Sequence, residues 1–196
     1  GIYGHSNPII RAAIAGALDD GINLAGHNLL EAKLAAVMCA RFPTLDLVRF
    51  TNSGTEANLM ALALAKAYTK RSKILVFAGG YHGAVVSFVK GTSPVNVPHD
   101  FIIGTYNDLR GAADLVQRHR ADLAAILVEP MQGSAGCIPA TKEFLETLRQ
   151  LATDCGAVLI FDEVMTSRLS AGGIQAQLGL RADLTTFGKY KIGRAH

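Results

Sequence analysis

Two short, continuously apolar segments constrain the fold of this chain more than any other feature of its sequence. Residues 123–128 have the sequence LAAILV and residues 157–161 the sequence AVLIF, with no polar residue in either. Such runs are typical of strands buried on both faces, as in parallel sheets covered by helices. Between them, Thr141 is a good N-cap for a helix that ends near Cys155, before Gly156. This order of elements predicts a βαβ unit.

The rest of the chain continues this alternation of strands and helices. Apolar spacing and turn signals predict further strands at residues 47–50, 73–77 and 184–187, and further helices at residues 28–41, 56–70 and 108–120. We therefore predict the α/β class, with three αβα layers around a mostly parallel sheet that is incomplete at both ends. In sheets of this kind, ligands bind outside the carboxyl ends of the strands.

The composition excludes several classes of protein. The chain is 49% hydrophobic and 18% charged, which is ordinary for a folded globular domain. Its net charge of +3 is spread along the sequence, so we expect no nucleic-acid partner. No apolar run reaches the ~20 residues of a membrane span, so we expect no membrane association. The three cysteines are far apart, which disfavours disulfides or a metal site and favours a reducing compartment. We expect the cytoplasm, with an organelle as the alternative.

Both ends of the sequence look artificial. Residues 191–196 (KIGRAH) follow no turn or helix pattern, and their back-translation resembles a common sequencing adapter. We expect this tail to be non-native and leave it out of the fold prediction. Residues 1–190 are interpreted as one partial domain.

A polar turn precedes the predicted helix at residues 56–70, and it contains Ser53, Gly54 and Thr55. A glycine turn that leads into a helix offers free backbone N–H groups and the positive end of the helix dipole, and the hydroxyl groups add donors. This turn is therefore a candidate phosphate site. The same residues also fit an ordinary helix N-cap.

Three further polar residues follow predicted strands. Tyr81 comes after a strand and a glycine pair, where its ring could stack on a flat ligand or fill a loop. Asp162 directly follows residues 157–161, where it could keep a ring nitrogen protonated, bind a metal or face water. Lys189 follows the last predicted strand and fits either a Schiff-base lysine or an ordinary surface charge.

Two competing chemistries are poorly supported. The apolar run before Asp162 and Glu163 resembles a Walker B element, but the chain has no GxxxxGK[ST] loop. A dinucleotide-binding dehydrogenase would need a GxGxxG turn after its first strand, and none is present. In contrast, a phosphate cradle, an aromatic plate, a carboxylate and a lysine, in this order, are what pyridoxal 5′-phosphate (PLP) requires.

The segments that carry these residues resemble the class III aminotransferases of fold type I, and within them the glutamate-1-semialdehyde 2,1-aminomutase group. The likeness runs from about residue 4 to residue 190, in the family's order and with similar gaps. The matching segments are TNSGTEA at 51–57, YHG at 81–83, VEP at 128–130, DEVMT at 162–166 and DLTTFGK at 183–189.

The resemblance implies two catalytic residues and a set of cofactor contacts. Lys189 would attach PLP covalently and move the substrate proton, and Asp162 would pair with the pyridine nitrogen. The other cofactor-binding positions implied are Ser53, Gly54 and Thr55 at the phosphate, Tyr81 and Val164 on the two ring faces, and His82, Glu129, Gln132 and Ser134 around the cofactor.

Two positions bear on the substrate. At position 165 this chain has Met, as the aminomutase group does, whereas many ω-transaminases have Gln there. At position 134 it has Ser, where the aminomutases usually have Asn. The expected activity is transfer of an amino group from a small amino compound to a carbonyl acceptor, between two molecules or within one. The resemblance also implies a homodimer. The alternative is that this polypeptide is a non-catalytic fragment of such an enzyme.

Overall fold

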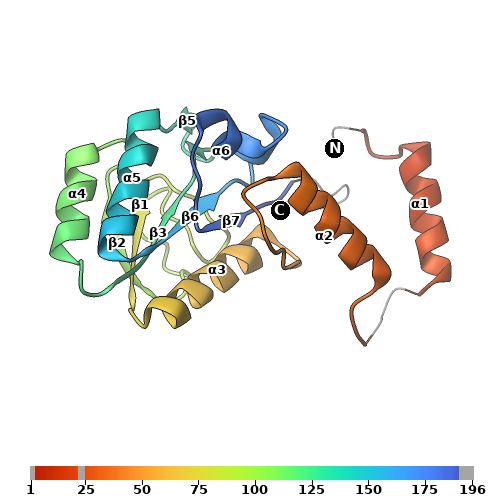
Figure 1. Ribbon diagram of the computed structural model, residues 1–196, viewed down its shortest axis with the longest axis horizontal. Coiled ribbons are helices and arrows are strands. Elements are labelled where there is room, and N and C mark those ends of the chain that lie inside the picture. Colours follow the sequence, from red (N-terminus) through yellow and green to blue (C-terminus); the bar gives the residue numbers. More distant parts are fainter. Residues whose placement is uncertain (1–2, 22–24, 190–196) are drawn as a thin grey trace.

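A parallel sheet forms the centre of the protein. The computed structural model describes residues 3–21 and 25–189. Five strands lie in the order β2-β1-β3-β6-β7, and every neighbouring pair is parallel. They are β1 (Lys73–Phe77), β2 (Asp100–Gly104), β3 (Leu123–Val128), β6 (Val158–Asp162) and β7 (Leu184–Thr186). The predicted α/β class and mostly parallel sheet are confirmed (Figure 1).

Helices cover both faces of this sheet. α3 (Gly54–Thr69) packs on one face, and α4 (Leu109–Arg118) and α5 (Lys142–Cys155) pack on the other. Alternate strand residues point to opposite faces, so Leu75 of β1 joins the core under α5 and Ile74 joins the core under α3. β3 and β6 are buried along their whole length, as their continuous apolar sequences predict.

Capping residues set the ends of the main helices. The Thr141 hydroxyl accepts a hydrogen bond from the N–H of Phe144 at 3.1 Å, and Gly156 ends α5 in the left-handed conformation, both as predicted. α3 begins at residue 54 and not at 56, because Ser53 is its N-cap and accepts a hydrogen bond from the N–H of Glu56 at 3.1 Å.

The order of the strands reverses between β1 and β3. The chain adds β2 on one side of β1 and then places β3, β6 and β7 on the other side. The carboxyl ends of β1 and β3 therefore form a topological switch point, where open α/β sheets bind their ligands. Tyr81 lies on the loop after β1, and Glu129 directly follows β3.

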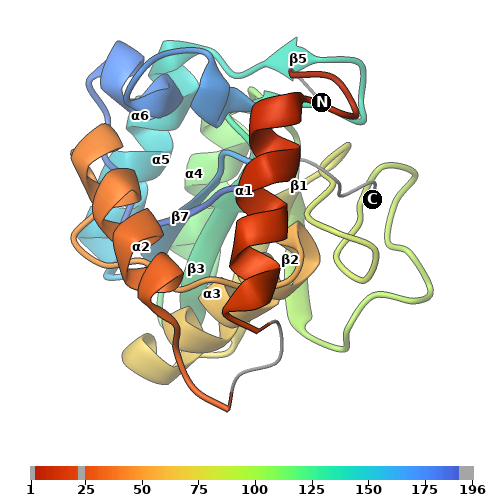
Figure 2. The ribbon, with the colours of Figure 1, turned by 90° about the vertical axis from the view of Figure 1, so that its right-hand side faces the viewer.

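Two helices lie outside the three layers. α1 (Pro8–Asp19) and α2 (Leu29–Arg41) contain no buried residue, and α1 is the more distant from the sheet (Figures 1 and 2). The residue after α2 anchors it: Phe42 is buried, and its ring centroid lies 4.6 Å from that of Phe187 after β7. The large apolar side chains that these helices expose are Ile9, Ile14, Leu18, Leu29, Leu30, Leu34 and Val37.

The predicted strand at residues 47–50 is wrong. This segment is irregular and Leu47 is 91% exposed, so it cannot lie inside a covered sheet. It pairs with no strand in the described part of the chain. The polar turn that follows it therefore reaches the site as the N-terminus of α3 and not as the end of a strand.

Several elements have no counterpart in the prediction from sequence. They are α1, β2, the hairpin of β4 (Met131–Gln132) and β5 (Ile138–Pro139), the 3₁₀ turn η1 (Thr166–Arg168) and α6 (Gly173–Leu178). The other predicted elements agree to within two residues at each end. Residues 191–196, the expected non-native tail, lie outside the described residues. Among residues 3–21 and 25–189, no helix is long and apolar enough to cross a bilayer.

Candidate active site

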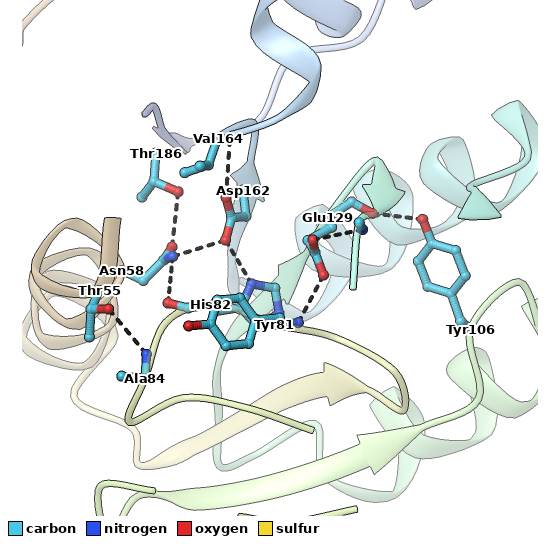
Figure 3. Close-up of polar contacts among 11 residues, drawn as sticks. Thr55, Asn58, Tyr81, His82, Ala84, Tyr106, Glu129, Asp162, Val164 and Thr186 are labelled. Atoms are coloured by element: carbon cyan, nitrogen blue, oxygen red, sulfur yellow. Dashed lines mark hydrogen bonds and ion pairs between the residues drawn. The ribbon is translucent and has the colours of Figure 1, made fainter. Parts of the chain in front are cut away.

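Asp162 lies at the carboxyl end of β6 and is held at both of its carboxylate oxygens (Figure 3). The residue is 5% exposed. Oδ2 accepts hydrogen bonds from Nδ2 of Asn58 and Nδ1 of His82, each at 2.9 Å, and Oδ1 accepts one from the N–H of Val164 at 3.1 Å. A carboxylate has about four lone-pair positions, so Oδ2 is saturated and Oδ1 retains acceptor capacity.

Asn58 on α3 is a candidate site residue that the sequence analysis misses. Its amide nitrogen donates to Asp162 and to the backbone carbonyl of His82, and its Oδ1 accepts from the Thr186 hydroxyl at 2.9 Å. One sequence signal could have found it. Asn58 lies on the same helix face as Leu62 and Ala65, and a polar residue in a buried apolar stripe requires hydrogen-bond partners.

His82 lies behind Asp162. It is 2% exposed, and its Nδ1 faces the carboxylate, so Nδ1 carries the proton in this contact. The resemblance to the family implies that His82 is one of the cofactor contacts. In the structure its ring is enclosed beside Asp162, and we therefore interpret it as a support for that carboxylate.

The loop after β1 packs directly on the first turn of α3. The N–H of Ala84 donates to the Thr55 hydroxyl at 3.2 Å. Gly83 has a φ of 127°, and a Cβ added there would lie 2.3 Å from Thr55 Oγ1. Only glycine allows so close an approach in this conformation. The contact places the Tyr81 loop beside the candidate phosphate site.

The N-terminus of α3 combines a helix cap with free donors. Ser53 caps the helix, and the Glu56 carboxylate accepts from the N–H of Asn52 at 2.7 Å. Helix geometry leaves the N–H groups of Gly54 and Thr55 without intrahelical acceptors. The cap interpretation is therefore correct, and phosphate binding by Ser53, Gly54 and Thr55 stays a prediction that this geometry permits.

Glu129 joins the two loops of the switch point. Its Oε2 accepts from the N–H of Tyr81 at 2.9 Å, and its Oε1 accepts from the N–H of Gly133 at 3.2 Å. Burial raises the pKa of this carboxyl, with a smaller contribution of the same sign from Asp162; the neighbouring His82 and the two N–H donors act against this increase. Glu129 therefore fixes the backbone from which the Tyr81 ring projects.

Tyr106 closes the far side of this cluster. Its hydroxyl donates to the backbone carbonyl of Glu129 at 2.7 Å. Burial raises the pKa of this phenol, and the charge of Glu129 adds to the effect, so the hydroxyl stays a hydrogen-bond donor at neutral pH.

Gln132 and Ser134 lie beside the switch point in different settings. Gln132 is buried, its Nε2 donates to the Ala78 carbonyl at 2.8 Å, and its Oε1 lies 2.6 Å from where a Cβ on Gly79 would be. Ser134 is exposed on the turn between β4 and β5. Their expected contacts with a cofactor stay predictions.

Val164 brings the start of α3 and the end of β7 together. A Cβ added to Gly54 would lie 3.5 Å from Val164 Cγ2, and one added to Gly188 would lie 3.0 Å from Cγ1. Val164 is only partly buried, so its side chain borders the site.

Lys189 lies three residues beyond the strand that neighbours β6. Thr186 is opposite Asp162 in the β6–β7 register, so the lysine and the carboxylate emerge at the same end of the sheet. Lys189 is exposed with a φ of 58°, and its backbone carbonyl accepts from the Arg168 guanidinium at 2.5 Å.

These residues fit PLP in the chemistry of their donors and acceptors. Asp162 Oδ1 offers an oriented carboxylate acceptor for a protonated ring nitrogen, and the N-terminus of α3 offers donors for a phosphate dianion. The Tyr81 residue is 41% exposed, and Lys189 is exposed at the same end of the sheet. The fold and these residues define an α/β protein with a candidate ligand site at a topological switch point.

Comparison with known proteins gives the family. The model of the family "Aminotransferase class-III" matches residues 1–193. The chain therefore belongs to the class III aminotransferases. Over 97% of its length it is 56% identical to a beta-phenylalanine transaminase from Variovorax paradoxus, and over 96% it is 42% identical to a glutamate-1-semialdehyde 2,1-aminomutase from Dichelobacter nodosus. It spans 44% and 48% of these two proteins, about half of their length.

Solved structures give the same result. The crystal structure of the Variovorax paradoxus beta-phenylalanine aminotransferase superimposes with a TM-score of 0.94, over 97% of this chain and 44% of that one, at 56% identity. A structure described as a transaminase with PLP bound superimposes with a TM-score of 0.86 at 38% identity, over 95% of this chain and 47% of that one.

Proposed function

We propose that this chain provides the cofactor-binding part of a PLP-dependent transaminase. The observation that carries the proposal is Asp162, a buried carboxylate held by three hydrogen bonds, with acceptor capacity left on Oδ1. A carboxylate held in this way suits a ring nitrogen that must stay protonated. PLP, when bound, supplies a ring that withdraws electrons from the carbon beside the reacting nitrogen.

Other residues of the chain bind the cofactor, orient it and transfer a proton. Ser53, Gly54 and Thr55 bind the phosphate at the start of α3, where donors and helix dipole favour an anion. Asp162 holds the ring nitrogen in its charged form, and the Tyr81 ring orients the cofactor from one face. Lys189 attaches the cofactor and moves a proton at its Nζ. This division of labour agrees with the places of these residues at one end of the sheet.

We further propose that the amino group passes between two molecules, from a small amino acid to a carbonyl acceptor. Identity to the beta-phenylalanine transaminase is 56%, against 42% to the aminomutase from Dichelobacter nodosus. A β-amino acid is accordingly the first donor to assay. Met165, the residue similar to the aminomutases, has its sulfur 2.1 Å from where a Cβ on Gly133 would be, so its side chain packs on the hairpin loop.

The alternative proposal is that this polypeptide, on its own, is a non-catalytic fragment of such an enzyme. The chain spans about half of its relatives, and α1 and α2 expose a series of large apolar side chains. An enzyme of this size would bury such a surface against other parts of itself or against a partner subunit, and we propose a homodimer for the complete protein.

Chemical trapping tests the proposed function directly. In the complete reading frame that contains this sequence, borohydride reduction in the presence of PLP should fix the cofactor to Lys189, as identified by mass spectrometry of the digested protein. Lys189→Ala should abolish both the label and the transfer of amino groups from β-phenylalanine to every 2-oxo acid that the unsubstituted protein uses. Lys142→Ala removes an exposed lysine of α5 and should change neither. A label on another lysine, or turnover without Lys189, would overturn the proposal.

A further inference from the structure

Asn58 occupies a position where an apolar side chain would be expected. It lies in the second turn of α3, it is 1% exposed, and the other buried residues of that helix are Leu62 and Ala65. An amide buried in such a place without hydrogen bonds would destabilise the fold. Its presence is therefore explained only by what it binds.

The Asn58 side chain forms hydrogen bonds with residues on three other segments of the chain. Nδ2 donates to the His82 carbonyl and to Asp162 Oδ2, both at 2.9 Å, and Oδ1 accepts from the Thr186 hydroxyl at 2.9 Å. The orientation of the amide is unambiguous, because a carbonyl and a carboxylate can only accept on one side and the hydroxyl can donate on the other.

Each of these contacts is next to a residue of the proposed cofactor site (Figure 3). The His82 carbonyl directly follows Tyr81, Asp162 is the proposed partner of the ring nitrogen, and Thr186 precedes Lys189 by three residues. Asn58 itself is one helical turn after Thr55. A single buried amide thus joins the segments proposed to hold the phosphate, the ring face, the ring nitrogen and the lysine.

We propose that Asn58 is a positioning residue of the transaminase. It has two effects: it saturates Asp162 Oδ2 together with His82, which leaves Oδ1 as the acceptor for the ring nitrogen, and it ties α3, the loop after β1 and the end of β7 to β6. The inference rests on the proposed function. A structural role alone would affect only the stability of the fold.

The substitution Asn58→Asp tests this in the complete protein. It preserves the size of the side chain and an acceptor for Thr186, but it removes both donors and sets a second carboxylate against Asp162. We expect kcat for transamination to fall about 100-fold with KM changed less than about threefold, because the reacting groups are misaligned and not lost. We expect the dissociation constant for PLP, measured by equilibrium dialysis, to rise about tenfold or more.

The matched control is Asn96→Asp, the same chemical change on the loop after β1. Within the described residues, the Asn96 side chain has hydrogen bonds to the backbone N–H and carbonyl of Ser87, at 2.8 and 2.9 Å, and to no group of the candidate site. Its substitution should lower the thermal midpoint of the cofactor-free protein while kcat and the dissociation constant for PLP stay within about twofold. Asn58→Ser, which retains one donor, should recover part of the PLP affinity lost in Asn58→Asp.

The outcomes separate this inference from the proposed function. If Lys189→Ala is inactive and unlabelled, but Asn58→Asp matches Asn96→Asp in kcat and PLP affinity, Asn58 is only a core residue and the inference fails alone. If Lys189→Ala stays active, the proposed function itself has failed. If Asn58→Asp does not fold, Asn58→Ser decides: unchanged kcat and PLP affinity in that variant also overturn the inference.

Discussion

The two oxygens of the Asp162 carboxylate are not equivalent acceptors. Oδ2 receives hydrogen bonds from Asn58 and His82, whereas the one donor to Oδ1 among the described residues is the N–H of Val164. Three donors on a nearly buried side chain leave it no freedom to rotate without losing a bond. A cationic ligand therefore meets a fixed acceptor at Oδ1 and does not have to order the side chain on binding.

The raised pKa of Glu129 predicts a specific pH dependence of stability. Burial makes the charged carboxylate costly in the folded state, so its pKa lies above the ordinary value of 4.5. Between pH 4.5 and the raised pKa of Glu129, the folded state therefore binds more protons than the unfolded state. The contribution of Glu129 to stability is complete below about pH 4.5 and is lost as the pH rises through the raised value.

Comparison with Glu129→Gln isolates this effect. The free energy of unfolding of the wild-type protein, minus that of the variant, should decrease as the pH is raised from about 4 to 8. Chemical denaturation across this range measures the difference. A difference that grows with pH would mean that the N–H groups of Tyr81 and Gly133 stabilise the carboxylate more than burial penalises it.

Motifs reveal site residues only where the residue type itself suggests chemistry. Asp162 and Lys189 could be singled out because each follows a predicted strand, and the structure places both at one end of the sheet. The apolar stripe around Asn58 indicates only that its amide needs hydrogen-bond partners. The partners of Asn58 and Thr186 lie on segments far apart in sequence and meet only in the fold, so the roles of these two residues were not predictable. Gly83 was noted within a motif, but its close approach to Thr55 is a property of the packing.

Among the elements, those with a strong local signal were predictable. β3 and β6 are continuously apolar, and α5 has both of its caps in the sequence. β2 has the sequence DFIIG and lies at the edge of the sheet, where a short, half-exposed strand has little pattern. Residues 47–50 show the reverse case: the segment LVRF has the composition of a strand, but it pairs with no strand among residues 3–21 and 25–189 and is irregular.

The contact between the loop after β1 and α3 predicts an unusually severe glycine substitution. Gly83→Ala would place a Cβ 2.3 Å from Thr55 Oγ1 at a φ of 127°, so both strain and overlap should destabilise the protein, by about 3 kcal/mol or more. Gly91→Ala is the control, since its φ is 83° with nothing within 4 Å, and it should cost about 1–2 kcal/mol from backbone strain alone. Thermal midpoints of the two variants measure the difference; equal shifts would show that α3 yields to the added methyl group.

At the scale of the whole molecule, the described chain is a covered sheet with two uncovered helices. The sheet has helices on both faces, whereas α1 and α2 bury no residue and expose Ile14, Leu18 and Leu34, among others. This arrangement was not predictable from the sequence, because an amphipathic helix shows which face is apolar and not what covers it.

Expression of the 196-residue chain alone should therefore differ from that of the complete reading frame. The chain alone should self-associate in size-exclusion chromatography and bind a hydrophobic dye, since large exposed apolar patches drive association. Replacing Ile14 and Leu18 by lysine should reduce both effects. A monomeric, dye-free chain that catalyses transamination would contradict the fragment interpretation.

The three bonds of the Asn58 amide also limit how a family with this site can change over time. A substitution at position 186 that removes the hydroxyl leaves Oδ1 of Asn58 without a donor. A shift of the backbone at position 82 leaves an N–H of the Asn58 amide without an acceptor. Neither defect can be repaired locally, because the partners lie on separate segments of the chain. We therefore expect substitutions at positions 58, 162 and 186 to be energetically coupled, so that a change at one of them is tolerated only together with a change at another.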